Sequence, residues 1–147
     1  MFSNILVAID GSPASMNALE KGIDLSQKFA SGLHLLHVVR QMQVPLNPGL
    51  MERYEELQRQ RHDFLRSAGE QTLNQAKRVA QSKGIESVKS DVGAGDPATE
   101  IVSYADKNAI DLVVMGSRGL GQVESMLMGS VSRKVGNKTK ADCLIVK

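Results

Sequence analysis

The 147-residue sequence is poor in aromatic residues and cysteine, and it carries almost no net charge. Phe, Tyr and Trp make up 3% of it, with no Trp, so the stacking platforms that bind single-stranded nucleic acid are not expected. A formal net charge of +2 is too small to indicate attraction to nucleic acid or to a membrane surface. The single cysteine, Cys143, excludes an internal disulfide and suits a reducing compartment.

Targeting and membrane-spanning segments are not expected either. The start, "MFSNILVAID", has no basic segment before a short apolar run, which argues against a signal peptide. No apolar run approaches the roughly 18 residues that cross a membrane. With 41% hydrophobic and 23% charged residues, the composition is that of an ordinary soluble domain. We therefore expect one cytoplasmic domain over residues 1–147, with no membrane and no nucleic-acid partner.

What the sequence does contain is a regular alternation of short apolar runs and amphipathic segments. The runs "ILVAI" and "DLVVMG" are nearly continuous Val, Ile and Leu, which is typical of strands buried on both faces. The alternating run "ESVKSDV" is weaker and indicates an outer strand. The expected strands span 5–9, 33–39, 86–92, 111–116 and 143–146, and the expected helices span 13–31, 50–83, 97–108 and 129–138.

This alternation predicts the fold class. Strands joined by right-handed helical crossovers form a parallel sheet covered on both faces. We therefore expect an α/β fold with a single-domain, open five-stranded parallel sheet, which is Rossmann-like. Ser12 and Asp96 are the expected helix N-caps, each followed by a proline, and Gly32 is the expected stop of the first helix. In the longest helix, the residues expected near one face are Tyr54, Leu57, Leu65, Ala68, Ala76, Val79 and Ala80.

The carboxyl ends of the predicted strands carry the candidate ligand site, because ligands of open parallel sheets bind at that edge. Asp10 follows the first strand, Val38 lies at the end of the second, and "MGSRGLGQVESMLMGSVS" follows the fourth. This glycine-rich stretch lacks the Gly-Lys-Ser or Gly-Lys-Thr ending of a Walker loop. Glu124 stands where a dinucleotide fingerprint needs its third glycine.

The spacing within this loop favours phosphate binding. Gly116 and Gly119 let backbone amides approach an anion, and nine residues later Gly129 and Ser130 begin the last predicted helix. Amides at that helix start, the hydroxyls of Ser130 and Ser132, and the charge of Arg118 add further phosphate donors. Three alternatives stay open: the loop merely turns, Asp10 only caps the next helix, or Arg118 is only solvated.

With these motifs the sequence resembles the universal stress protein family over essentially its whole length. "NILVAIDGSPAS", "DLVVMGSRG" and "ADCLIVK" carry the resemblance, and the spacing Gly116-x2-Gly119-x9-Gly129-Ser130 is similar to that of the ATP-binding branch. The resemblance implies that these four residues surround phosphate or ribose. It also implies that Asp10 holds the ribose or lies near a Mg²⁺ or Mn²⁺ ion. The rest of the implied nucleotide shell is Val38 at the adenine, with Met115, Ser117, Arg118, Val131 and Ser132.

The resemblance also implies a function: an ATP-binding regulator of the stress response, with ATP, ADP or AMP as its ligand. Hydrolysis is expected to be slow or absent, because no histidine lies near the loop and Glu124 is its only carboxylate. Self-phosphorylation is known in the family. The alternatives are an adenylyl-transferring or ATP-hydrolysing enzyme, and an interaction domain without a ligand. The apolar C-terminal strand "CLIVK", expected at the sheet edge, is implied to pair antiparallel with its copy in a homodimer.

Overall fold

The computed structural model describes residues 1–41, 47–120 and 128–147, which form alternating strands and helices. All the predicted strands and helices occur, and their ends differ from the prediction by at most two residues. In chain order they are β1 (Asn4–Ala8), α1 (Pro13–Phe29), β2 (Gly32–Val39), the 3-10 turn η1 (Pro48–Leu50), α2 (Met51–Ser82), β3 (Val88–Ala94), α3 (Pro97–Lys107), β4 (Leu112–Gly116), α4 (Ser130–Lys138) and β5 (Asp142–Val146). Among the helices described, none combines the length and the apolar character needed to span a membrane.

The five strands form one parallel sheet in the order β3-β2-β1-β4-β5. The chain builds outward from β1 through β2 to β3, and then crosses back to add β4 and β5 on the other side. This order confirms the predicted α/β fold and the predicted place of β3 at an edge. Because the strand order reverses between β1 and β4, the connections there leave in opposite directions and open a crevice at the carboxyl ends.

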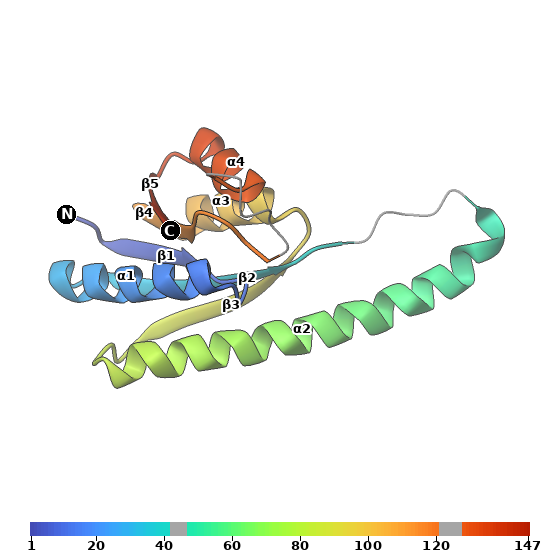
Figure 1. Ribbon diagram of the computed structural model, residues 1–147, viewed down its shortest axis with the longest axis horizontal. Helices are drawn as coiled ribbons and strands as arrows, with labels where there is room; N and C mark the ends of the chain where they lie inside the picture. Colours follow the sequence, from blue (N-terminus) through green and yellow to red (C-terminus); the bar gives the residue numbers. More distant parts are fainter. Residues whose placement is uncertain (42–46, 121–127) are drawn as a thin grey trace.

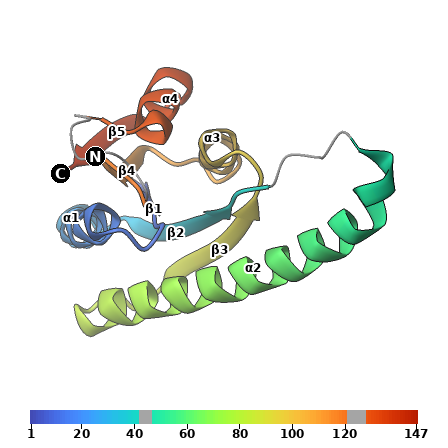
Figure 2. The same cartoon turned by 45° about the vertical axis from the view of Figure 1, so that its right-hand side comes forward.

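Two helical layers cover the sheet, with α1 and α2 on one face and α3 and α4 on the other (Figures 1 and 2). Alternate residues of each central strand supply the two cores, as the pleat of a strand requires. Toward α1 and α2 the sheet presents Ile5, Val7, Leu33, Leu35, Leu112 and Val114, and toward α3 and α4 it presents Leu6, Leu36, Val113 and Met115.

Both predicted N-caps are present and fix where α1 and α3 begin. The Ser12 hydroxyl accepts a hydrogen bond from Ser15 N at 3.2 Å, and an Asp96 carboxylate oxygen accepts one from Thr99 N at 3.0 Å. The two hydrogen bonds from Thr99 hold the pKa of Asp96 below its usual range. The predicted stop of α1 was wrong. The helix ends at Phe29, its C-cap Ala30 has a left-handed φ of 54°, and Gly32 already belongs to β2.

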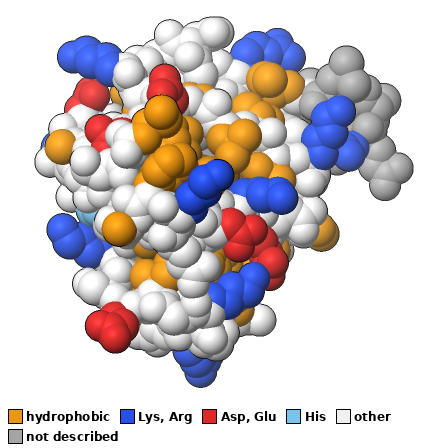
Figure 3. All heavy atoms as spheres, turned by 90° about the vertical axis from the view of Figure 1, so that its left-hand side faces the viewer, with side chains coloured by type: hydrophobic (Ala, Val, Ile, Leu, Met, Phe, Trp, Pro, Cys, Tyr) orange, Lys and Arg blue, Asp and Glu red, His pale blue; other side chains and the backbone are white. Residues whose placement is uncertain are grey.

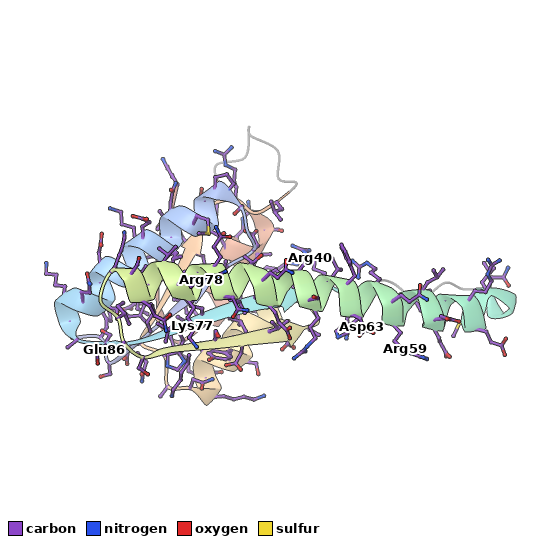
Figure 4. All side chains as sticks on the ribbon, turned by 90° about the horizontal axis from the view of Figure 1, so that it is seen from below. Arg40, Arg59, Asp63, Lys77, Arg78 and Glu86 are labelled. Carbon is purple, nitrogen blue, oxygen red and sulfur yellow. The ribbon has the colours of Figure 1, made fainter. Side chains whose placement is uncertain are left out.

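Helix α2 differs most from its prediction. Its buried residues, Gly69, Leu73, Ala76 and Ala80, all lie in the C-terminal half. Leu57 is 59% exposed and Ala68 is also exposed, so the predicted stripe coincides only in part with the buried face of the helix. The N-terminal half extends past the end of the sheet, where Figure 4 labels Arg59 and Asp63, whereas Lys77 and Arg78 lie beside the sheet. Helical periodicity identified an apolar stripe, but only half of this helix has a sheet to cover. We refer to residues 50–65 as the arm.

His34 and His37 point to opposite faces of the sheet, as their spacing on one strand predicted. On the α3 side, His34 Nδ1 lies 3.1 Å from the Tyr104 hydroxyl, which donates to Asp91 Oδ2 at 2.9 Å. The Tyr104 hydroxyl gives its one proton to Asp91, so it can only accept from His34. These hydrogen bonds therefore assign the Nδ1–H tautomer to His34. Burial, aided by Lys89, lowers the pKa of His34 against the opposing effect of Asp91.

The lowered pKa of His34 predicts a loss of stability in mild acid. Below a pH of about 6.5, the unfolded chain takes up a proton on this imidazole more readily than the folded protein does. We therefore expect the free energy of unfolding to fall as the pH drops from about 7.5 to about 5, and His34→Gln to make that decline shallower. Urea denaturation at several pH values measures it. Equal slopes for parent and variant would contradict the assignment.

Candidate functional site

A cavity of about 380 Å³ opens at the carboxyl ends of β1, β2 and β4. Its size is within the range of sites that hold small organic ligands, and its walls combine apolar side chains with a few polar ones. The apolar wall comprises Ile9, Leu36, Val38, Val39, Leu65, Ile101, Met115 and Val131, and the polar side chains are Asp10, Ser15, His37, Arg40, Arg61, Arg118 and Ser132. The cavity therefore lies where the strand order reverses, at the predicted edge of the sheet.

Most of the residues predicted for the ligand site line this cavity. They are Asp10, Val38, Met115, Gly116, Arg118, Gly119, Gly129, Val131 and Ser132. Ser117 and Ser130 do not line it. Ser117 is buried beneath the loop at 3% exposure, and Ser130 is exposed at the first residue of α4.

The two ends of the glycine-rich loop meet beside the cavity. Gly129 N donates to Ser117 O at 2.5 Å, and the Ser132 hydroxyl donates to Gly116 O at 2.7 Å. Ser117 N in turn donates to Val146 O at 2.6 Å, which joins the loop to β5. Residues 121–127, which include Glu124, lie outside the described residues. The Gly129 amide and the Ser132 hydroxyl thus hold the two ends of the loop together, and the Ser117 amide ties them to β5. A ligand would have to compete for these three donors.

The start of α4 supplies the remaining donors. Its N-cap is Gly129, which has no side chain to accept from the first-turn amides. These amides have no acceptor within the helix, and they carry the positive end of the helix dipole. The cavity reaches this helix start through Gly129, Val131 and Ser132. An anion bound there would satisfy backbone donors that α4 itself leaves open.

The carboxylate of Asp10 connects the end of β1 to the glycine-rich loop. Its Oδ1 accepts from Ser12 N at 2.9 Å, and its Oδ2 accepts from Leu120 N at 3.1 Å. Gly119 leaves room for this contact, because a Cβ there would lie 2.5 Å from Asp10 Oδ2. Asp10 therefore stabilises the entry to α1, which was the alternative to a ligand role. It also faces the cavity.

Packing explains Gly116 without any ligand. A Cβ at this position would lie 2.8 Å from the carbonyl carbon and from the Cβ of Ala14 in α1. Atoms do not approach that closely without displacing the backbone, so β4 and α1 pack this tightly only with glycine here. The two glycines of the predicted pair thus have different roles: Gly116 allows helix and strand to meet, and Gly119 allows the loop to reach Asp10.

Asp10 is the only carboxylate among the described residues that line the cavity. Within the described ranges, no group of three or more His, Cys, Asp or Glu side chains is arranged to hold a metal ion. A magnesium ion commonly binds through one or two carboxylates, water and the phosphates of a nucleotide. The donor set fits such a phosphate-bound ion and does not fit a site built from protein ligands alone.

Several lining residues were missed by sequence reasoning. His37 lines the same cavity as the loop, so the expectation of no histidine near it was wrong: the parallel strands bring the ends of β2 and β4 together. His37 Nδ1 lies 2.8 Å from Ile9 O, which engages one ring nitrogen. Arg61 donates from the arm to Arg40 O at 2.9 Å. His37 and Arg40 flank Val38 and were within reach of the sequence argument, whereas only the position of α2 brings Arg61 and Leu65 to the cavity.

Comparisons with known proteins place this chain in a family. Residues 1–147 match the Universal stress protein family. The universal stress protein YxiE of Bacillus subtilis is 34% identical over 149 residues, with both chains covered completely. The solved structure of the hypothetical protein MJ0577 is 26% identical with a TM-score of 0.84, and the match covers 100% of this chain and 96% of that one.

Two solved structures with the same fold contain adenine nucleotides. One is a universal stress protein in complex with cAMP, with 24% identity, a TM-score of 0.68, and coverage of 99% of this chain and 96% of that one. The other is the universal stress protein from Archaeoglobus fulgidus in complex with dAMP, with 17% identity, a TM-score of 0.67, and coverage of 99% and 98%. At these identities the likeness to this chain is one of fold.

The two hydrogen bonds of Asp10 predict a cost in stability when its charge is removed. Asp10→Asn replaces one carboxylate oxygen by an amide that cannot accept from a backbone N–H, so we expect a loss of about 1–2 kcal/mol in the free energy of unfolding. The matched control Asp106→Asn changes an exposed carboxylate of α3 and should shift stability by less than about 0.5 kcal/mol. Chemical denaturation measures both variants. Equal effects would show that Asp10 does not hold the loop.

Proposed function

The chain belongs to the universal stress protein family, and we propose that its cavity binds ATP and that other proteins respond to the nucleotide-bound state. The observation that carries this proposal is the meeting of both ends of the glycine-rich loop beside Asp10, at the carboxyl edge of the sheet. The cAMP and dAMP complexes of related proteins support an adenine nucleotide as the ligand class. ADP and AMP are the competing ligands within that class.

We assign the parts of the nucleotide by the chemistry of the lining residues. The apolar wall around Val38 suits adenine, and a carboxylate oxygen of Asp10 suits a ribose hydroxyl. Arg118, Gly119 and the first turn of α4 suit the phosphates, because they combine a positive charge with backbone donors. A magnesium or manganese ion would neutralise part of the phosphate charge, and Asp10 would then be its protein ligand in place of the ribose contact.

We propose that hydrolysis is slow or absent. Hydrolysis needs a group that orients or deprotonates the attacking water. The two candidates among the described lining residues are held by other contacts. His37 donates from Nδ1 to Ile9 O and packs the Nε2 side of its ring against Gly69 of α2, and both Asp10 oxygens accept backbone hydrogen bonds. A regulator that holds its nucleotide fits these contacts better than an adenylyl-transferring or ATP-hydrolysing enzyme.

The nucleotide site is tested by a branched side chain at the start of α4. Gly129 is buried and lines the cavity, so Gly129→Val should obstruct the phosphate end and weaken MgATP binding at least tenfold. Gly136→Val is the matched control, because a Cβ at this α4 position meets no atom within 4 Å. Calorimetric titration with MgATP measures both affinities, with circular dichroism as a check of folding. Unchanged binding by a folded Gly129→Val protein would refute the site.

We also propose that two copies pair through β5. This strand ends the sheet, and its residues 143–146 are only half-buried. Figure 3 views the side where β5 and the N-terminus lie, and hydrophobic side chains gather there between charged ones. Such an edge tends to acquire a partner strand. Burial also raises the pKa of the Cys143 thiol, which keeps the thiol neutral at this edge.

The hydrogen-bond pattern of β5 predicts which residue a partner strand would need. Asp142 N donates to Asp111 O, and Val146 O accepts from Ser117 N, so the even-numbered residues bond to β4. Successive residues of a strand direct their N–H and C=O groups to opposite sides, so those of Cys143 and Ile145 point to the open edge of the sheet. Ile145→Pro should therefore leave the pairing with β4 intact and weaken a β5 dimer, whereas Ile145→Ala should leave that dimer in place. Sedimentation velocity measures the dimer fraction, and an undiminished dimer in Ile145→Pro would exclude this pairing.

A further inference from the structure

The arm carries a row of exposed apolar side chains that neither the cavity nor β5 explains. Leu50, Leu57 and Phe64 are 50%, 59% and 73% exposed. They recur every seven residues, which is close to two helical turns, so they form one line along the helix. We call them the arm stripe. Such a line leaves apolar surface in contact with water, and a second helix packed along it would remove that contact.

A different face of the arm already serves the rest of the molecule. The half-buried residues of the arm include Tyr54, Gln58, Arg61 and Leu65, of which the last two line the cavity. At about 100° per residue, these positions are centred roughly a quarter-turn around the helix from the arm stripe. The arm also extends beyond the sheet, as Figures 1 and 4 show. A second helix can therefore reach the stripe without disturbing the cavity wall.

We propose that the arm stripe pairs with the same stripe of a second copy of this chain, with the two helices antiparallel and Leu57 on the two-fold axis. This register places Leu50 opposite Phe64 of the second copy and Leu57 opposite its own equivalent. Each of the three apolar side chains then faces an apolar side chain of the second copy. The interface is isologous, as expected of a two-fold pair.

The charges beside the stripe favour the antiparallel direction. Arg53 and Asp63 are both exposed and lie on the same flank of the stripe. In the antiparallel register, Arg53 comes within two residue rises, about 3 Å along the helix axis, of Asp63 of the second copy, twice by symmetry. In a parallel pair this flank would instead face the opposite flank of the second copy, so Arg53 and Asp63 would not meet. Arg61, which comes level with Arg53 of the second copy, lies on the other flank and is engaged with Arg40 O.

The size of the stripe limits the strength of the pairing. Three apolar positions on each arm bury far less than the 1,200 Å² or so of a standard interface. We therefore expect a dissociation constant between about 10 µM and 1 mM. The association is independent of the nucleotide, and it would add to β5 pairing by joining one β5 dimer to another.

Sedimentation equilibrium over a wide concentration range tests the pairing. In an Ile145→Pro background, which removes β5 pairing, the protein should gain mass with concentration, and Leu57→Asp should abolish that gain. The matched control Arg59→Asp, on the far side of the helix from the stripe, should leave it unchanged. Arg53→Asp and Asp63→Arg should each weaken association about fivefold, and the double variant should restore it. All these side chains are exposed, so the variants should fold normally.

Cysteine cross-linking tests the direction, in a Cys143→Ser background. Under mild oxidation, a mixture of Leu50→Cys and Phe64→Cys proteins should form the mixed disulfide, and Leu50→Cys alone should form none. Adding Ile145→Pro should leave this cross-link intact, which separates arm pairing from β5 pairing. A mass that does not rise with concentration, a rise that survives Leu57→Asp, or a Leu50→Cys protein that cross-links to itself would overturn the proposal.

Discussion

The carboxylate of Asp10 holds together two segments that are 110 residues apart in the sequence. One oxygen accepts from Ser12 at the entry to α1, and the other accepts from Leu120 in the glycine-rich loop. This contact is available because β1 and β4 are adjacent in the sheet, so their carboxyl ends lie side by side. The cavity, the closed loop and the start of α4 all depend on that adjacency. Without it, the glycines after β4 would have no carboxylate to approach.

Two different close contacts explain why two glycines of the loop are not interchangeable. Gly116 is required where β4 touches α1, and Gly119 is required where the loop meets Asp10. Neither requirement involves a ligand, yet together they bring the loop to the cavity. The site is thus organised in advance by packing and backbone hydrogen bonds, which reduces what a bound nucleotide would have to order.

Helix α2 shows how one element can serve two surfaces. Its C-terminal half covers the sheet through Leu73, Ala76 and Ala80, and Gly69 lets it pack against the His37 ring. Toward the N-terminus of the helix, Arg61 and Leu65 form part of the cavity wall. The arm stripe, in the same N-terminal half, is exposed. The proposed nucleotide site and the proposed contact with a second copy thus use different faces of one helix.

The sequence by itself determined the strand and helix order, the two N-caps, the strand end that carries Asp10 and the loop that meets it. These features depend on local periodicity, on capping chemistry and on the general rule that parallel strands share a carboxyl edge. Only the tertiary structure decided that His37 and Arg61 line the cavity, that Ser117 and Ser130 do not, and that Leu57 faces outward. Periodicity reports which residues of a helix share a face, whereas burial depends on whether another element covers that face.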